Sequence, residues 1–237
     1  MRRWTPTGLS LVLEPSPPLS APSRFFVSTL LHPSASAPSD LPAALAEHAA
    51  SPHWVGIHLG QFAGVAAEGT TLVALAATFE PGRAAAWARV GLAGAVASLA
   101  VYAAVQAVDG VSNHVMAHRW AAAIGEARGL AYEAAFAVRE IEVGLTSLFS
   151  LLFGSTLVVF ALAMLLSTRY PTWLGGIGLL GGLGTIMVGL EQASNSFSDL
   201  AVTVFMVVGP VDLIWAIATG ILMWRLAPQL ARDSNTA

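Results

Sequence analysis

The sequence contains no cysteine and no lysine, and charged residues occupy only 11% of its 237 positions. The absence of cysteine excludes disulfides, thiolate nucleophiles, iron–sulfur clusters and cysteine-type zinc sites. The net charge is −3 with sparse cations, so no nucleic-acid partner is expected, because phosphate binding needs clustered positive charge. A soluble domain carries roughly 25% charged residues. The low charge therefore argues against an ordinary water-soluble fold.

Hydrophobic residues make up 55% of the chain and are gathered into long runs. A helix needs roughly 20 apolar residues to cross a hydrocarbon core of about 30 Å. Five runs are long enough: 54–79, 84–108, 142–166, 172–190 and 200–225. The sequence therefore predicts an all-α, polytopic transmembrane helical bundle over residues 54–228, with the lipid bilayer as its surroundings.

The two ends of the chain have a different composition. Residues 1–53 are rich in proline, alanine and serine, and prolines interrupt the apolar pieces 8–13 and 25–31. We expect 1–53 to be largely disordered, with 33–53 as a linker that contains a short helix near 42–50. The tail 229–237 is also expected to be disordered. A degenerate sixth span near the amino end stays an alternative.

The segment 109–141 is more polar than its neighbours and interrupts the series of spans. Its pattern predicts a partly apolar helix over about 113–127, with Gly129 as the stop signal. From Leu130 the pattern is helical to about Leu166, which is too long for one perpendicular span. This helix therefore has to project, tilt or bend.

Arginine placement predicts the orientation of the bundle. Short cytoplasmic loops accumulate positive charge, and one arrangement puts Arg83, Arg169, Arg225 and Arg232 together at the inner surface. The carboxyl terminus is then cytoplasmic. A basic complement made only of arginine, together with abundant alanine, is typical of a GC-rich bacterial genome, so we expect a bacterial inner membrane.

Two segments carry a family resemblance. They are Val138-Arg-Glu-Ile-Glu142 and Pro171-Thr-Trp-Leu-Gly-Gly-Ile-Gly-Leu179. They resemble an Arg-x-Ile-Glu-like segment and a Pro-x-Trp-Leu-x-Gly-x-Gly-Leu span start in a large uncharacterised bacterial membrane family, a domain of unknown function. The likeness extends over roughly 54–228. It implies a bundle of usually six spans and no activity, and this chain departs from it at the amino end.

Acidic residues within the apolar runs are the first candidate site. Glu68 and Asp212 lie near the middle of their runs, where a charge costs at least ~2.5–3.5 kcal/mol. His58 and Gln61 share with Glu68 a helix sector of about 80°. Arg139 and Glu142 lie three residues apart, on one helix face.

These residues predict an outward-opening polar pocket. Glu68 and Asp212 would form its floor, and His58, Gln61, Arg139 and Glu142 its rim. Burial favours protonated acids, which suits proton relay or a cationic ligand. In the alternative interpretation each acid is protonated, or is satisfied by an arginine or a hydroxyl, and only orders the bundle.

The histidines His114 and His118 are four residues apart, a spacing that can place two imidazoles on one metal ion. No His-Glu-x-x-His motif and no acid at ligand spacing accompanies them. We therefore expect a solvated or interfacial helix face there, with no bound metal and no cofactor.

Small residues define one face of the run 172–190. Gly178, Gly182, Thr185 and Gly189 form small pairs four residues apart that let helices approach closely. This face predicts either packing within the bundle or a homodimer seam.

No nucleophile motif is present, so the chain is not expected to be a hydrolase. The favoured hypothesis is a membrane protein that binds or translocates a small ligand or protons at Glu68 and Asp212. A membrane-embedded enzyme that uses the same acids, with or without a histidine-bound metal, is one alternative. A structural or regulatory partner that packs through the glycine face is the other.

Overall fold

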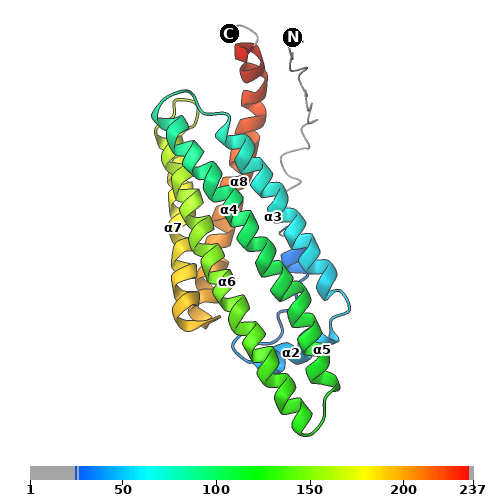
Figure 1. Ribbon diagram of the computed structural model, residues 1–237. Coiled ribbons are helices and arrows are strands. Elements are labelled where there is room, and N and C mark those ends of the chain that lie inside the picture. Colours follow the sequence, from blue (N-terminus) through cyan, green and yellow to red (C-terminus); the bar gives the residue numbers. More distant parts are fainter. Residues whose placement is uncertain (1–24, 26, 235–237) are drawn as a thin grey trace, which may run out of the picture.

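The computed structural model describes residues 25 and 27–234, and within this part of the chain the fold is helical without strands. The predicted disorder and the degenerate span over the first 24 residues lie outside the described residues. The helices are α2 (Leu41–Ala50), α3 (Trp54–Ala76), α4 (Arg83–Gln106), the π-helical η1 (Ala107–Asn113), α5 (His114–Ala122), α6 (Glu126–Leu165), α7 (Thr172–Asn195) and α8 (Asp199–Ser234). They pack as an antiparallel bundle (Figure 1).

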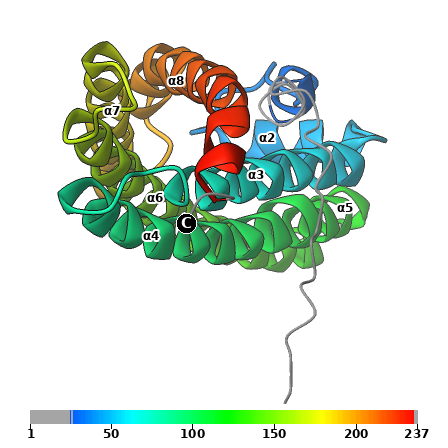
Figure 2. The ribbon, with the colours of Figure 1, turned by 90° about the horizontal axis from the view of Figure 1, so that it is seen from above.

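Five helical segments of the described chain are long and apolar enough to cross a membrane: Trp54–Ala76, Arg83–Ala122, Glu126–Leu165, Thr172–Asn195 and Asp199–Gln229. The prediction of an all-α polytopic bundle is confirmed by this count and by the absence of strands. The protein is a multi-pass membrane protein. Seen from the end in Figure 2, α4 and α6 form one side of the bundle, and α8 stands beside α7 on the opposite side.

Two of these segments are much longer than the predicted spans. Residues 83–122 continue from α4 through η1 into α5. The helix α6 begins at Glu126, 16 residues before the predicted span and four residues before the long helix predicted from Leu130. Forty residues at 1.5 Å each extend about 60 Å, twice the hydrocarbon thickness. Both segments therefore project beyond the ends of α7 and α8 (Figure 1).

The predicted helix stop at Gly129 is wrong. The chain turns at Gly125, which has φ 58°, a left-handed conformation that glycine adopts without steric cost. Gly129 lies inside α6, with open space around the position of a Cβ. Because both positions are glycine, the residue type alone does not indicate at which of them the helix ends and the chain turns.

The short helix expected near 42–50 is present as α2, capped by the Asp40 side chain, which accepts from the amide of Ala43. It is packed against the projecting part of the bundle, whereas a linker was predicted. Leu41 and Leu45 form a buried cluster with Ala117 of α5 and Ala135 of α6. Alanines at these helix positions leave room for two leucines, so α2 covers the end of the bundle.

The predicted small-residue face of α7 packs within the bundle. A Cβ on Gly182 would lie 2.7 Å from the carbonyl oxygen of Gly154 in α6, and one on Gly189 would lie 2.8 Å from the amide nitrogen of Leu151. Gly178 faces Ala161 of α6 and Trp215 of α8. Because α6 and α8 already cover this face, a homodimer through it would have to displace them.

At the opposite end of the bundle, Glu80 joins two loops. Its carboxylate accepts from the Ser167 hydroxyl at 2.7 Å and the Thr168 amide at 2.6 Å, linking the α3–α4 loop to the α6–α7 loop. Burial alone would raise the pKa of Glu80, but these hydrogen bonds hold it at about 2. The two loops are therefore held together by a charged acceptor.

Candidate functional site

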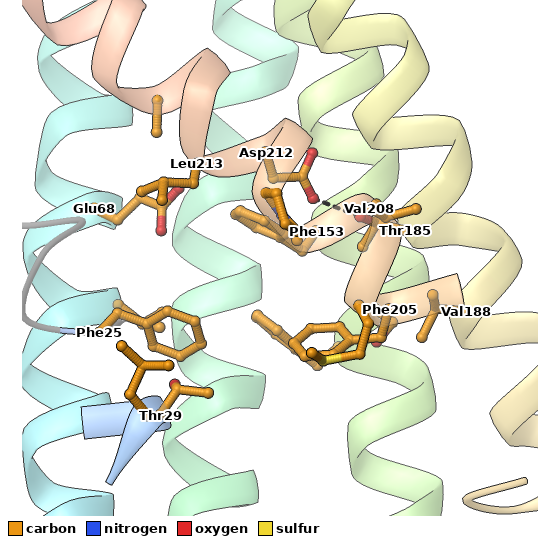
Figure 3. Close-up of a pocket in the computed structure, with 18 residues that line it drawn as sticks. Phe25, Thr29, Glu68, Phe153, Thr185, Val188, Phe205, Val208, Asp212 and Leu213 are labelled. Carbon is orange, nitrogen blue, oxygen red and sulfur yellow. Dashed lines mark hydrogen bonds between the residues drawn. The ribbon is translucent and has the colours of Figure 1, made fainter. Parts of the chain in front are cut away.

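A cavity of about 220 Å³ lies between α3, α6, α7 and α8 and is lined mainly by apolar side chains. Phe25, Phe149, Phe153, Phe205 and Met206 form much of its wall (Figure 3). The chain segment that precedes α2 also contributes Thr29 and Leu30 to the lining.

Two carboxyl groups enter this apolar cavity from opposite sides. Glu68 projects from α3 and Asp212 from α8 (Figure 3). Asp212 Oδ2 accepts from the Thr185 hydroxyl of α7 at 2.7 Å, whereas its Oδ1 is buried with no hydrogen-bond partner among the described residues. Neither acid forms an ion pair with an arginine or histidine of the described chain. The alternative prediction, in which a neighbouring hydroxyl donates a hydrogen bond to the buried acid, therefore holds for one of the two oxygens of Asp212.

Gly181 provides the space that Asp212 occupies. Pro210 lies two residues before Asp212 inside α8 and removes one backbone donor from the helix. A Cβ on Gly181 of α7 would lie 2.0 Å from Asp212 Oδ1. Glycine at position 181 is therefore required for this carboxylate to lie where it does.

The other four predicted residues do not line this cavity. His58 and Gln61 are buried on the same face of α3 as Glu68, toward its amino end. Gln61 donates to the Thr29 hydroxyl at 3.3 Å and accepts from Gln106 at 3.5 Å, and Gln106 donates to the Tyr102 hydroxyl at 2.7 Å. Through Thr29, this polar chain reaches the cavity wall.

Arg139 and Glu142 lie on one face of α6, as predicted from their spacing, and form an ion pair at 2.9 Å. Glu142 is buried and also accepts from the amide of Asn113 in η1. Arg139 donates to the carbonyl of Pro38 at 3.1 Å and lies over the ring of Phe197, 4.4 Å from its centre. This pair therefore joins α6 to η1 and to two loops.

The predicted single pocket is thus two separate sites, and the second one contains residues that sequence reasoning missed. His58 Nε2 lies 3.0 Å from Asp109 Oδ2 of η1, and Trp54 donates from its indole to the Asp109 carbonyl at 3.1 Å. The ring of Trp54 contacts the rings of His48 and His58, whose centres lie 3.8 and 4.4 Å from its own. Only 1% of the surface of Trp54 is exposed, so its side chain packs inside the protein.

Two histidines of this second site lie outside the spans. Burial lowers the pKa of His32, and the nearby Asp109 opposes that shift. Burial also lowers the pKa of His48 to about 4. Both imidazoles are therefore neutral at pH 7.

His118 is exposed on α5, whereas His114 is partly buried and its Nδ1 has no hydrogen-bond partner in the described chain. Their rings meet edge to face, with centres 4.5 Å apart. In the described chain no third ligand joins them, and the one group with metal-ligand spacing is His32, His58 and Asp109.

Comparisons with protein-family models, with curated proteins and with solved structures find no match. The resemblance to an uncharacterised bacterial membrane family stays a prediction.

Proposed function

We propose that this membrane protein binds a small, largely apolar cation in the cavity between α3 and α8, in exchange for protons carried by Glu68 and Asp212. The observation that supports this most is that Glu68 and Asp212 both line an apolar cavity and form no ion pair within the described chain. Asp212 Oδ1 is buried against Gly181 with no hydrogen-bond partner in the described chain, so a cation in the cavity would act on this carboxylate through its charge.

The wall of the cavity suits the body of such a ligand. Phe149, Phe153 and Phe205 offer aromatic faces, which attract cations as well as apolar groups. An anion would meet two acids and no cationic side chain among the lining residues. The lining therefore favours a positively charged hydrophobic molecule over an anion or a sugar.

Proton exchange follows from the cost of charge inside a membrane. A carboxylate without a counter-ion in hydrocarbon costs at least ~2.5–3.5 kcal/mol, so the empty site holds protonated acids. A cation provides the missing counter-charge and releases a proton. Translocation of a ligand in exchange for protons requires that the two compete for the same site in this way. We include such translocation in the proposal.

The proposed location is a bacterial inner membrane with a cytoplasmic carboxyl terminus. Arg83 begins α4 and Arg169 lies in the α6–α7 loop, which Glu80 joins to the α3–α4 loop at the end of the bundle where α8 finishes (Figure 1). The positive-inside rule puts this end in the cytoplasm. Arg119, Arg128 and Arg139 lie toward the other end, but acidic residues share their segment.

Calorimetric titration of the full-length protein in detergent with benzyltrimethylammonium tests this function. Glu68→Gln and Asp212→Asn each remove a charge with little change of volume, and each is expected to weaken binding at least tenfold. Glu133→Gln, an exposed site on α6, is the matched control and should bind as the wild type does. Equal binding by all four proteins would contradict the proposal.

A further inference from the structure

A second ligand site is indicated where three chain segments meet at the outer end of α3. His32 precedes α2, His58 lies in α3 and Asp109 lies in η1. One ligand atom from each of these residues lies within 4.8 Å of the other two. The His58 side chain is 2% exposed and that of Asp109 18%, so these two groups are largely shielded from solvent.

Backbone carbonyls fix the tautomers of both histidines. His58 Nδ1 donates to the carbonyl of Trp54 at 2.8 Å, and His32 Nδ1 donates to the carbonyl of Pro33 at 2.7 Å. In each neutral ring the proton is then on Nδ1, and Nε2 keeps its lone pair. Histidines that bind metals usually have this arrangement, with the other ring nitrogen donating to a carbonyl.

The contact between His58 and Asp109 then brings two acceptors together. A lone pair on Nε2 faces a carboxylate oxygen at 3.0 Å, so a positive charge has to lie between them, either a proton or a metal ion. Zinc binds nitrogen and oxygen ligands at about 2.0–2.2 Å, which at a tetrahedral angle separates them by about 3.3 Å. The observed spacing is close to that separation.

Local backbone structure holds Asp109 in this position. The chain changes from α-helix to π-helix over 107–113, and such π-helical turns frequently occur at functional sites. A Cβ on Gly110 would lie 2.5 Å from the Cβ of His58, so glycine permits the close approach of η1 to α3. The indole of Trp54 binds the Asp109 carbonyl and fixes the same turn.

We propose that His32, His58 and Asp109 bind one divalent transition-metal ion of the zinc class, with water as the fourth ligand. Two imidazoles and one carboxylate form a ligand set suited to zinc or copper. The ligand atom of His32 lies within 4.8 Å of the other two, and His32 has to move inward to reach the separation of about 3.3 Å between two ligands of one zinc ion. The ion would fasten the segment that carries Thr29 and Leu30, which line the cavity, to α3 and η1.

Titration of the EDTA-stripped, full-length protein with Co²⁺, followed by visible absorption, tests this site. One Co²⁺ per chain should bind and be displaced by Zn²⁺. His32→Ala, His58→Gln and Asp109→Asn should each weaken Co²⁺ binding at least tenfold. The matched control is the double variant His114→Ala/His118→Ala, which removes the other histidine pair and should bind as the wild type does.

Unfolding in EDTA separates loss of the site from loss of the fold. His58 is buried, so its variant is interpreted only if its thermal midpoint without metal matches that of the wild type. His32 is only half-buried in the segment before α2, and its variant remains decisive if His58→Gln unfolds. Absence of stoichiometric Co²⁺, or a site lost only with His114 and His118, would overturn the proposal.

Discussion

His58 and Asp109 are 51 positions apart in the sequence, and their side chains meet at 3.0 Å between Nε2 and Oδ2. The two residues come from different membrane-spanning segments, α3 and the π-helical turn that follows α4. Their contact depends on Gly110, where a side chain would collide with His58.

Replacement of Gly110 by alanine is expected to push η1 away from α3. The added Cβ would lie 2.5 Å from that of His58, and overpacking of this kind typically costs about 1–3 kcal/mol. Thermal unfolding in detergent should show a lower midpoint. Gly129→Ala, at a position with open space on α6, is the control and should not lower it. Equal midpoints for the two variants would contradict the close approach.

Acid is expected to destabilise the protein through His48. Its pKa is lowered to about 4 in the folded chain against 6.5 as a free group, first by burial and less by Arg139 and His32, while Asp109 and Glu47 oppose the shift. Between pH 6.5 and 4 the unfolded chain binds the extra proton, so stability falls as the pH falls through this window.

His48→Phe should flatten that part of the curve of thermal midpoint against pH, because phenylalanine keeps the ring against Trp54 and does not titrate. EDTA in every sample removes any contribution from metal binding. An unchanged slope between pH 6.5 and 4 would show that another group is responsible.

Close packing of α6 and α7 predicts a second pair of glycine variants. A Cβ on Gly182 would lie 2.7 Å from the carbonyl oxygen of Gly154, whereas Gly176 has nothing within 4 Å of that position. Gly182→Ala should therefore destabilise the protein by about 1–3 kcal/mol, and Gly176→Ala should not. Fluorescence-detected unfolding of both variants measures the difference. A Gly182→Ala protein as stable as the wild type would mean that the helices lie further apart.

Orientation can be measured with single cysteines, because the chain has none of its own. Cysteine at the exposed positions Arg83 and Ser39, at opposite ends of the bundle, should react differently with a membrane-impermeant maleimide on intact cells. The positive-inside rule predicts labelling of Ser39→Cys and protection of Arg83→Cys. The reverse pattern would invert the proposed topology.

The five spans could be predicted from the sequence because each is an apolar run long enough for a bilayer. The helix from Leu130 that is too long for one span was predicted as well, and α6 begins four residues earlier, at Glu126. The continuation of residues 83–122 as one helical segment beyond 108 was not predicted, because residues 109–122 have an ordinary mixed composition. In this part of the chain the helix continues beyond the residue at which the apolar run ends. The packed position of α2 depends on Ala117 and Ala135, which are far away in the sequence.

Glu68 and Asp212 could be identified as candidate site residues, because a charged acid in the middle of a membrane-spanning run has a high energetic cost. Asp109 gave no comparable signal, because it follows the run 84–108 directly, where a polar residue usually marks a helix end. Nothing in the pattern indicates that the helix continues as a π-helix and turns this carboxylate toward His58. Its partner is set by tertiary packing, which no local spacing encodes.

The most direct test of the proposed cation site compares benzyltrimethylammonium with neopentylbenzene, its neutral isostere, in binding to the same protein. The two molecules have nearly the same shape, so their ratio of dissociation constants isolates the effect of charge. We predict that the wild type prefers the cation at least tenfold and that the double variant Glu68→Gln/Asp212→Asn loses this preference. A wild-type protein that binds both molecules equally, or a double variant that keeps the preference, would contradict a cation site at Glu68 and Asp212.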